Sequence, residues 1–308
     1  MSAFDVYCQL DGIVSGSVFL DEPMARHTSF RIGGPAALYI ECASVSDITR
    51  TLEAVRLQDM PWMVVGKGSN LLVSDEGFNG AIISLGKEFK RFALPDSDKD
   101  ESLLVAGAGA MLSNLVQAAF KNGFSGFEFA VGIPGTLGGA LFMNAGSASE
   151  WISSIVDWVT VLRPDNGLVR YRGEELDWGY RQSGISHNEI IVECGLRIEP
   201  GHTGQIRARM EASLKRRRKT QPLTLPSAGS VFRNPEGDSA GRMIEELGLK
   251  GYKVGGAEVS SLHANFIVNT GNARAWDVVE IITHIRKRVK EEYDRELQPE
   301  IRFVGFPL

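Results

Sequence analysis

The stretch from Phe129 to Ser149 constrains the fold more than any other segment, because its 21 consecutive residues carry no charge. That length would span a bilayer as a helix. However, five of these residues are glycine, and Pro134 and Asn144 interrupt the stretch as well. Glycine and proline destabilise a helix interior, and irregular backbone is unfavourable in hydrocarbon. The sequence therefore predicts a buried loop system here and no membrane helix.

The composition favours a globular chain over one whose main role is to bind nucleic acid. The 308 residues include 33 Lys and Arg against 38 Asp and Glu, which gives a net charge of −5. An acidic chain is unsuited to neutralising phosphates along a nucleic acid. The hydrophobic share of 43% is typical of globular proteins, and the length predicts two or three domains. We expect no nucleic-acid partner and no membrane partner.

The cysteines and the N-terminus indicate a cytoplasmic protein. Cys8, Cys42 and Cys194 are far apart and odd in number, so we expect buried free thiols in place of disulfides or zinc ligands, and no metal site. No Lys or Arg precedes Arg26, so the sequence predicts no secretory n-region.

Strands and helices are predicted to alternate in the first part of the chain. We expect strands at 37–42, 62–65, 81–85 and 103–106, followed by a β-rich region at 155–198. A helix capped by Ser46-Asp47 is predicted to bury Ile48, Leu52 and Val55. A second helix is predicted to bury Leu112, Leu115, Val116 and Ala119, with Gly123 at its C′ position.

The pattern changes near Pro200-Gly201, where we expect a second domain to begin. Helices are predicted at about 204–219, 241–247 and 273–293, and short strands at 230–233 and 264–268. The last helix is expected to bury Ala275, Val278, Val279, Ile282, Val289 and Tyr293. A final strand at 301–304 is expected to pack back on another part of the chain.

Two glycine-rich segments are candidates for binding a phosphate-bearing cofactor. Gly66-Lys67-Gly68-Ser69-Asn70 follows a strand, as a phosphate loop does, although an ordinary tight turn is the better interpretation of this loop taken alone. Position 71 is leucine, so the Rossmann spacing is absent, and the chain has no Walker A motif. The segment from Gly132 to Gly146 favours close approach to a flat, apolar cofactor, since its glycines lie in uncharged sequence.

Seven segments of the chain resemble those of a known family and occur in the same order as in that family. The segments are Thr28 to Ala36, Val65 to Leu72, Gly132 to Gly146, Tyr180 to Ser183, Ala228 to Pro235, His263 to Asn269 and Pro299-Glu300. Together they resemble the UDP-N-acetylenolpyruvoylglucosamine reductases. The early segments are shared with a wider superfamily of FAD-linked oxidases, and those from Tyr180 onward are the specific ones.

The resemblance implies a flavoenzyme of peptidoglycan synthesis, in which NADPH and non-covalently bound FAD reduce the enolpyruvyl ether of a UDP-sugar. It implies that Arg181 and Glu300 stabilise the enolic intermediate and that Ser230 donates the proton. A guanidinium suits charge that develops on a carboxylate. An anionic Glu300 would repel that charge, so we expect it to be neutral or compensated by Arg181.

The resemblance also implies a set of binding residues. For the cofactor these are Gly66, Lys67, Gly68, Ser69, Asn70, Leu71, Gly107, Gly132, Ile133, Pro134, Gly135, Gly138, Gly139, Asn144 and Gly146. For the substrate they are Tyr180, Asn234, Lys253 and His263, with a structural role for His263 equally plausible. Only 49 positions separate Arg181 from Ser230, so the chain resembles the shorter branch, which lacks an inserted loop carrying a substrate-covering tyrosine.

The basic run Lys215 to Lys219 has three interpretations, of which a solvated helix face is favoured over a diphosphate-facing edge and a nucleic-acid patch. The predicted fold class is α+β. We expect a two-lobed FAD-binding domain at 1–202 (lobes at about 21–86 and 87–202), a substrate-binding domain at 203–296 and a returning segment at 297–308, with the active site in the cleft between the two domains. The alternatives are another FAD-linked oxidase and a non-catalytic nucleotide- or RNA-binding module.

Overall fold

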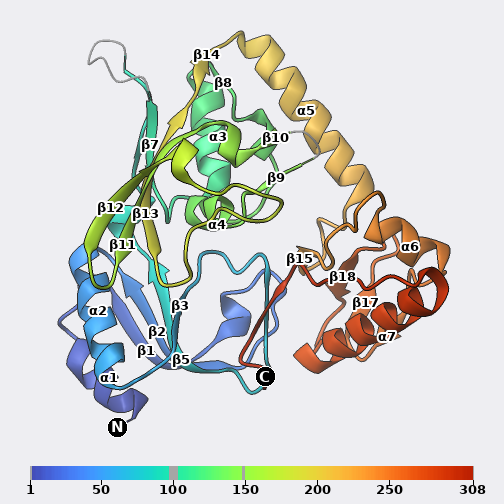
Figure 1. The fold of residues 1–308 in the computed structure, drawn as a ribbon, viewed down its shortest axis with the longest axis horizontal. Coiled ribbons are helices and arrows are strands. Elements are labelled where there is room, and N and C mark those ends of the chain that lie inside the picture. Colours follow the sequence, from blue (N-terminus) through green and yellow to red (C-terminus); the bar gives the residue numbers. More distant parts are fainter. Residues whose placement is uncertain (1, 97–102, 148–149, 308) are drawn as a thin grey trace. The chain divides into compact units, whose positions relative to one another are not determined.

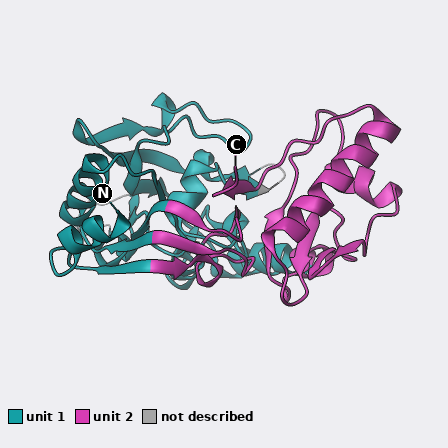
Figure 2. Cartoon of the chain, turned by 90° about the horizontal axis from the view of Figure 1, so that it is seen from below, with its two compact units in different colours: residues 1–20, 38–67, 80–215 teal, residues 21–37, 68–79, 216–308 magenta. Residues whose placement is uncertain are grey.

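The computed structural model describes residues 2–96, 103–147 and 150–307, and Figure 1 shows its helices and strands. Residues 148–149, at the end of the uncharged stretch, lie outside the described residues. The chain forms two compact units (Figure 2). The first comprises Met1–Leu20, Leu38–Lys67 and Gly80–Lys215, and the second comprises Asp21–Ala37, Gly68–Asn79 and Arg216–Leu308.

Two main sheets form the framework of the first unit. One has the order β1-β2-β5-β3, from β1 (Ser17–Pro23), β2 (Pro35–Cys42), β5 (Phe78–Leu85) and β3 (Trp62–Val64). The other is antiparallel with the order β12-β11-β13-β7-β6, from β12 (Gly167–Arg172), β11 (Val156–Arg163), β13 (Ile190–Arg197), β7 (Leu103–Gly107) and β6 (Phe92–Ala93). Two short pairs join β9 (Gly146–Ser147) to β10 (Glu150–Trp151) and β8 (Phe124–Ser125) to β14 (Glu199–Pro200).

The helices of the first unit are α1 (Ala3–Leu10), α2 (Val45–Leu57), α3 (Leu112–Lys121) and α4 (Leu137–Phe142), and α5 (Thr203–Thr220) continues into the second unit. The predicted face of α2 is confirmed, because Ile48, Leu52 and Val55 are buried. The predicted cap is wrong: the side chain of Ser44 accepts the N–H of Asp47, and the buried Asp47 carboxylate accepts the N–H of Ala43.

The prediction for α3 is confirmed in detail. Leu112, Leu115, Val116 and Ala119 are its buried residues. Gly123 has a φ of +74°, the left-handed conformation expected after the end of a helix. On α5 the charged end is exposed at Lys215, Arg216, Arg218 and Lys219, as the solvated-face interpretation predicts.

The second unit has its own sheet and its own apolar core. The antiparallel sheet has the order β15-β18-β17-β16, from β15 (Ser227–Ser230), β18 (Phe266–Asn269), β17 (Ala257–Val259) and β16 (Lys253–Val254). Its helices are α6 (Ala240–Glu246) and α7 (Ala275–Tyr293). The predicted strand at 230–233 is wrong, since the strand lies at Ser227–Ser230. On α7 the predicted face omitted Ile281 and Ile285, which are buried, and included Val279 and Tyr293, which are only partly buried.

The final strand packs back on an earlier part of the chain, as predicted, and its pairing explains why residues 68–79 belong to the second unit. β19 (Arg302–Val304) pairs in parallel with β4 (Leu71–Val73). In addition, the Asp75 carboxylate accepts the N–H groups of Ala275 and Trp276 at the start of α7, at 2.8 and 3.2 Å. These contacts tie residues 68–79 to the second unit, although sequence analysis placed them in the range 1–202. The functional division into the predicted ranges stays a prediction.

The state of the cysteines was predicted in part. Cys42 and Cys194 are buried free thiols, but Cys8 is exposed, because it lies on the outer face of α1. No helix in the described part of the chain combines the length and apolar character that crossing a bilayer requires.

Candidate active site

The segment from Gly132 to Thr136 presents backbone N–H groups that have no acceptor among the described residues. These are the N–H groups of Gly132, Gly135 and Thr136. Gly132 and Gly135 have φ values of +76° and +129°, which only glycine adopts without strain. Because clustered, unpaired N–H groups bind phosphate oxygens, this segment fits the diphosphate of a dinucleotide such as FAD.

The loop at 66–70 packs on the same segment through Gly66. A Cβ at Gly66 would lie 2.2 Å from Thr136 Oγ1, so only glycine allows this approach. Within the described chain, the N–H groups of Gly66, Lys67 and Gly68 also donate to no protein acceptor. Gly68 has a φ of +61°, and a Cβ there would lie 2.2 Å from the His27 carbonyl oxygen. The geometry of the two glycine segments therefore favours the interpretation that they bind one phosphate-bearing ligand over the interpretation that they are ordinary tight turns.

Several predicted cofactor glycines have a packing reason of their own. A Cβ at Gly107 would lie 2.3 Å from the Phe89 carbonyl oxygen, and one at Gly146 would lie 2.2 Å from the Glu150 carbonyl oxygen. A Cβ at Gly138 would approach Ala108 to 3.0 Å. At Gly139 the nearest atom would be 3.6 Å away, so packing does not require a glycine at this exposed position. Contact of these residues with a cofactor stays a prediction.

Arg181 lies in a strained turn. Gly179 and Gln182 exchange backbone hydrogen bonds of 3.0 and 3.2 Å, which makes Tyr180 and Arg181 the two central residues. Arg181 has a φ of +57°, a conformation that costs a non-glycine residue free energy and that clusters at functional sites. Its guanidinium carbon lies 5.5 Å from the ring centre of Trp151 and 5.3 Å from that of Tyr180.

Ser230 is the last residue of β15 and follows a β-bulge. The pairing of β15 with β18 shifts register between Ser227 and Ser230, and Gly229 in the bulge has a φ of +78°. Bulges redirect the next side chain, and they are common beside active sites. Among the described residues no hydrogen-bond partner is found for the Ser230 hydroxyl, which is partly exposed. Its proton is therefore available to a ligand.

Glu300 is fixed by its backbone. Its N–H donates to the Val231 carbonyl at 2.7 Å, and its own carbonyl accepts the Asn70 side-chain amide at 3.1 Å. Within the second unit these bonds link Glu300 to the residue after Ser230 and to the loop at 66–70. The side chain of Glu300 is partly exposed, and not fully buried.

The predicted substrate residues differ in their surroundings. Asn234 is exposed and its side chain accepts the Ala240 N–H at the start of α6. Lys253 pairs across the sheet with Glu258 at 3.0 Å and is largely exposed. Burial, followed by the positive charge of Lys250, lowers the pKa of His263. Its Nδ1 accepts the Asn265 N–H at 3.2 Å, so a neutral His263 carries its proton on Nε2.

Sequence reasoning missed one buried amide, that of Asn265. Asn265 brackets Phe232 with hydrogen bonds to its N–H at 2.9 Å and its carbonyl at 2.8 Å, just beyond Ser230. A polar residue in an otherwise apolar segment was the available signal for Asn265. Asn144, whose contact with the cofactor stays a prediction, donates to the Gly179 carbonyl at 3.0 Å and accepts the Ser153 N–H at 3.2 Å.

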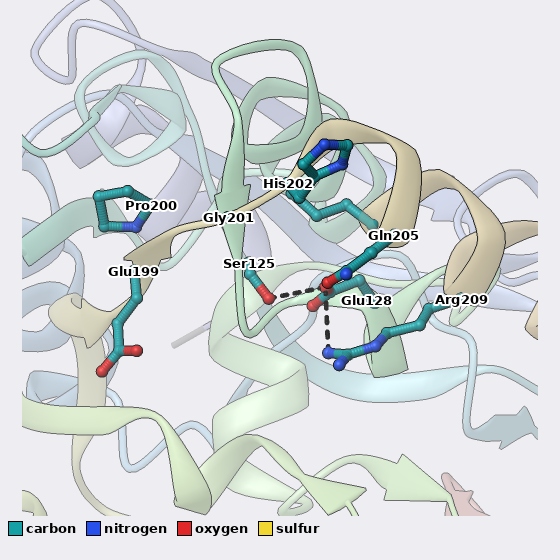
Figure 3. Close-up of a pocket in the computed structure, with 9 residues that line it drawn as sticks. Ser125, Glu128, Glu199, Pro200, Gly201, His202, Gln205 and Arg209 are labelled. Atoms are coloured by element: carbon teal, nitrogen blue, oxygen red, sulfur yellow. Dashed lines mark hydrogen bonds and ion pairs between the residues drawn. The ribbon is translucent and has the colours of Figure 1, made fainter.

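A small hollow elsewhere in the first unit holds none of the predicted site residues (Figure 3). It is lined by Ser125, Glu128, Glu199, Pro200, Gly201, His202, Gln205, Ile206 and Arg209. Glu128 accepts the Ser125 hydroxyl at 2.9 Å and pairs with Arg209 at 3.7 Å. These contacts satisfy the buried carboxylate of Glu128.

Comparisons with known proteins agree with this geometry. Residues 36–172 match the FAD binding domain family, and residues 221–304 match the family described as UDP-N-acetylenolpyruvoylglucosamine reductase, C-terminal domain. A reductase of that name from Heliobacterium modesticaldum is 46% identical over 292 residues, which cover 94% of this chain and 91% of the relative. The corresponding protein of Caldanaerobacter subterraneus is 41% identical over 94% of each chain.

A solved structure has the same fold. The crystal structure of UDP-N-acetylenolpyruvylglucosamine reductase from Thermus caldophilus is 34% identical and matches with a TM-score of 0.81, covering 95% of this chain and 100% of that one. The resemblance and the predicted α+β fold class are thereby confirmed. The chain belongs to the UDP-N-acetylenolpyruvoylglucosamine reductase family.

Proposed function

We propose that the chain catalyses the FAD-dependent reduction, by NADPH, of UDP-N-acetylglucosamine enolpyruvate to UDP-N-acetylmuramate in peptidoglycan synthesis. The observation that carries this proposal is the match to reductases of this name over nearly the whole of both chains. The unpaired N–H groups of the two glycine segments support a dinucleotide cofactor. NADPH and the UDP-sugar are the small-molecule partners, and we place the reaction in the cytoplasm.

The glycine segments at 66–70 and 132–139 would hold FAD, which would supply hydride transfer from NADPH to the enolpyruvyl group. Hydride addition at the terminal carbon pushes electrons toward the substrate carboxylate. A guanidinium that forks onto both carboxylate oxygens stabilises that charge most in the transition state. We assign this role to Arg181. Its strained turn supports the assignment, since strain of this kind is retained where function requires it.

Ser230 donates the proton that completes the reduction. A serine hydroxyl is a weak acid, but the carbanion-like intermediate is a strong base, so position decides the rate. The bulge at Gly229 directs the side chain, and no protein acceptor in the described chain competes for its proton. Glu300 would assist as the neutral acid, by donating a hydrogen bond to the enolic intermediate.

Asn234, Tyr180, Lys253 and His263 are proposed to contact the UDP-sugar. The Nε2–H of His263 is available as a hydrogen-bond donor, because Nδ1 accepts the Asn265 N–H. Lys253 suits a diphosphate, and its exposed ammonium would exchange Glu258 for the ligand.

The proposal is tested by the colour of the protein. The purified protein should show a flavin spectrum, which NADPH bleaches under argon and which the enolpyruvyl UDP-sugar then restores. Restoration by air alone, with no response to the UDP-sugar, would instead identify an FAD-linked oxidase. A colourless protein with salt-dependent RNA binding would identify a non-catalytic module. Parallel lines in double-reciprocal plots of the initial rate would support a ping-pong mechanism, in which NADPH and the UDP-sugar bind alternately to one site.

A further inference from the structure

Asn144 is buried and joins two segments of the first unit that are distant in sequence. It is 4% exposed and follows α4 directly. Its side-chain amide donates to the Gly179 carbonyl at 3.0 Å, and its side-chain oxygen accepts the Ser153 N–H at 3.2 Å. The two backbone partners determine the orientation of the amide, because a carbonyl only accepts and an N–H only donates.

Both partners of Asn144 belong to the surroundings of Arg181. Gly179 opens the turn that has Arg181 at its third position, and its carbonyl also accepts the Gln182 N–H that closes the turn. Ser153 lies two residues after Trp151, whose ring faces the Arg181 guanidinium and meets the Tyr180 ring edge-on at 5.9 Å. One amide therefore links the backbone of the turn to the segment that carries its aromatic neighbour.

The turn needs such support, because Arg181 is held in the left-handed conformation at a φ of +57°. A non-glycine residue stays there only if surrounding contacts outweigh the strain. Asn144 is itself left-handed, with a φ of +41°, which asparagine tolerates better than most residues. The protein thus retains an asparagine after α4, where glycine would end the helix with less strain.

Resting on the proposed function, we propose that Asn144 is a positioning residue for Arg181 and not a cofactor ligand. Its amide fixes the turn at 179–182, so that the guanidinium meets the substrate carboxylate in a single geometry. The Gly132–Gly146 segment and the Arg181 turn are joined through this side chain. A misplaced catalytic group costs rate even when every catalytic side chain is present.

Asn144→Asp is the sharpest test. It keeps the volume, the tolerance of the left-handed backbone and the acceptor for Ser153, but it places a carboxylate oxygen against the Gly179 carbonyl. The matched control is Asn122→Asp, since the exposed Asn122 also donates to a backbone carbonyl, that of Ala118 at 2.9 Å at the end of α3. Single-turnover kinetics separate bleaching by NADPH from restoration by the UDP-sugar.

We expect Asn144→Asp to slow restoration roughly 10- to 100-fold, the range for a catalytic group displaced by about 1 Å. Bleaching by NADPH, the visible flavin spectrum and the amount of bound FAD should stay unchanged, as they should for Asn122→Asp. Adding Asn144→Asp to Arg181→Ala should slow restoration no further, because Asn144 acts through Arg181. Asn144→Gly, which also keeps the backbone conformation, should slow restoration in the same way.

A normal restoration rate in Asn144→Asp would overturn the inference, and so would either of two further results. One is loss of FAD from both Asn144 variants, which would show that the residue serves the cofactor segment. The other is a full multiplication of the two effects in the double variant, which would show independent roles. A normal restoration rate in the single variant Arg181→Ala would refute the proposed role of Arg181. A normal restoration rate in Asn144→Asp, with a slow rate in Arg181→Ala, would refute only the positioning role of Asn144.

Discussion

Replacing Arg181 by glycine and by alanine separates the strain of its turn from its proposed chemistry. Arginine and alanine both carry a Cβ, so both should bear the cost of a φ of +57°, whereas glycine should not. Both substitutions remove the guanidinium and its contacts with Trp151 and Tyr180. The difference in stability between the two variants is therefore independent of the guanidinium and reports the backbone at position 181.

The magnitude follows from two opposing terms. The left-handed conformation costs a non-glycine residue about 1–2 kcal/mol. The unfolded chain has more conformational freedom with glycine at this position than with alanine, which lowers the stability of the Gly variant by about 0.4–1 kcal/mol. We therefore expect the Gly variant to be more stable than the Ala variant by about 1 kcal/mol, a difference that results from these two terms.

Urea unfolding measures this difference, and single-turnover kinetics on the same samples measure the chemistry. Restoration of the flavin colour by the UDP-sugar should slow by roughly 10²- to 10³-fold in both variants, as for loss of one stabilising donor. Bleaching by NADPH should be unchanged. An Ala variant as stable as the Gly variant would refute the strain argument. Different restoration rates in the two variants would show that the backbone conformation at position 181 also affects the chemical step.

Three further predictions concern the rest of the chain. Asn265→Ala leaves the N–H and carbonyl of Phe232 unpaired in the interior, so the free energy of unfolding, measured in urea, should fall by about 2–4 kcal/mol. Burial and the charge of Lys250 lower the pKa of His263, so this side chain binds a proton more readily in the unfolded chain than in the folded one, and the free energy of unfolding should fall as the pH drops below 6.5. A His263→Gln variant should lack this part of the pH dependence. A variant with the same pH profile as the unsubstituted protein would contradict this prediction. Burial raises the pKa of the Cys42 thiol to about 12 and also raises that of Cys194, so a thiol reagent should label Cys8 in the folded protein and the other two only after denaturation.

Local periodicity predicted the elements whose burial repeats regularly. The faces of α2 and α3 follow from apolar spacing, and Gly123 marks the end of α3 because left-handed backbone favours glycine. The cap of α2 was misplaced, since Ser44, Ser46 and Asp47 all suit a helix start, and only the three-dimensional contacts select Ser44. The strand at Ser227–Ser230 was missed because alanine, glycine and two serines carry no β signal.

Long-range polar contacts account for what no local pattern reveals. Residues 21–37 and 68–79 join the second unit through bonds such as Asn269 to the Phe30 carbonyl and Asp75 to the start of α7. The site residues came from the family resemblance, since Arg181 and Ser230 alone read as turn residues. Their support by Asn144, by Trp151 and by the Gly229 bulge emerged only from the fold.

The most direct test of the central claim is the proton transfer from Ser230. A Ser230→Ala protein should bind FAD and be bleached by NADPH at the normal rate, because the hydroxyl takes no part in that step. Restoration of the colour by the enolpyruvyl UDP-sugar should be slower by roughly 10²- to 10⁴-fold, the usual contribution of a positioned acid. Restoration at the rate of the unsubstituted protein would contradict the assignment of Ser230 as the proton donor.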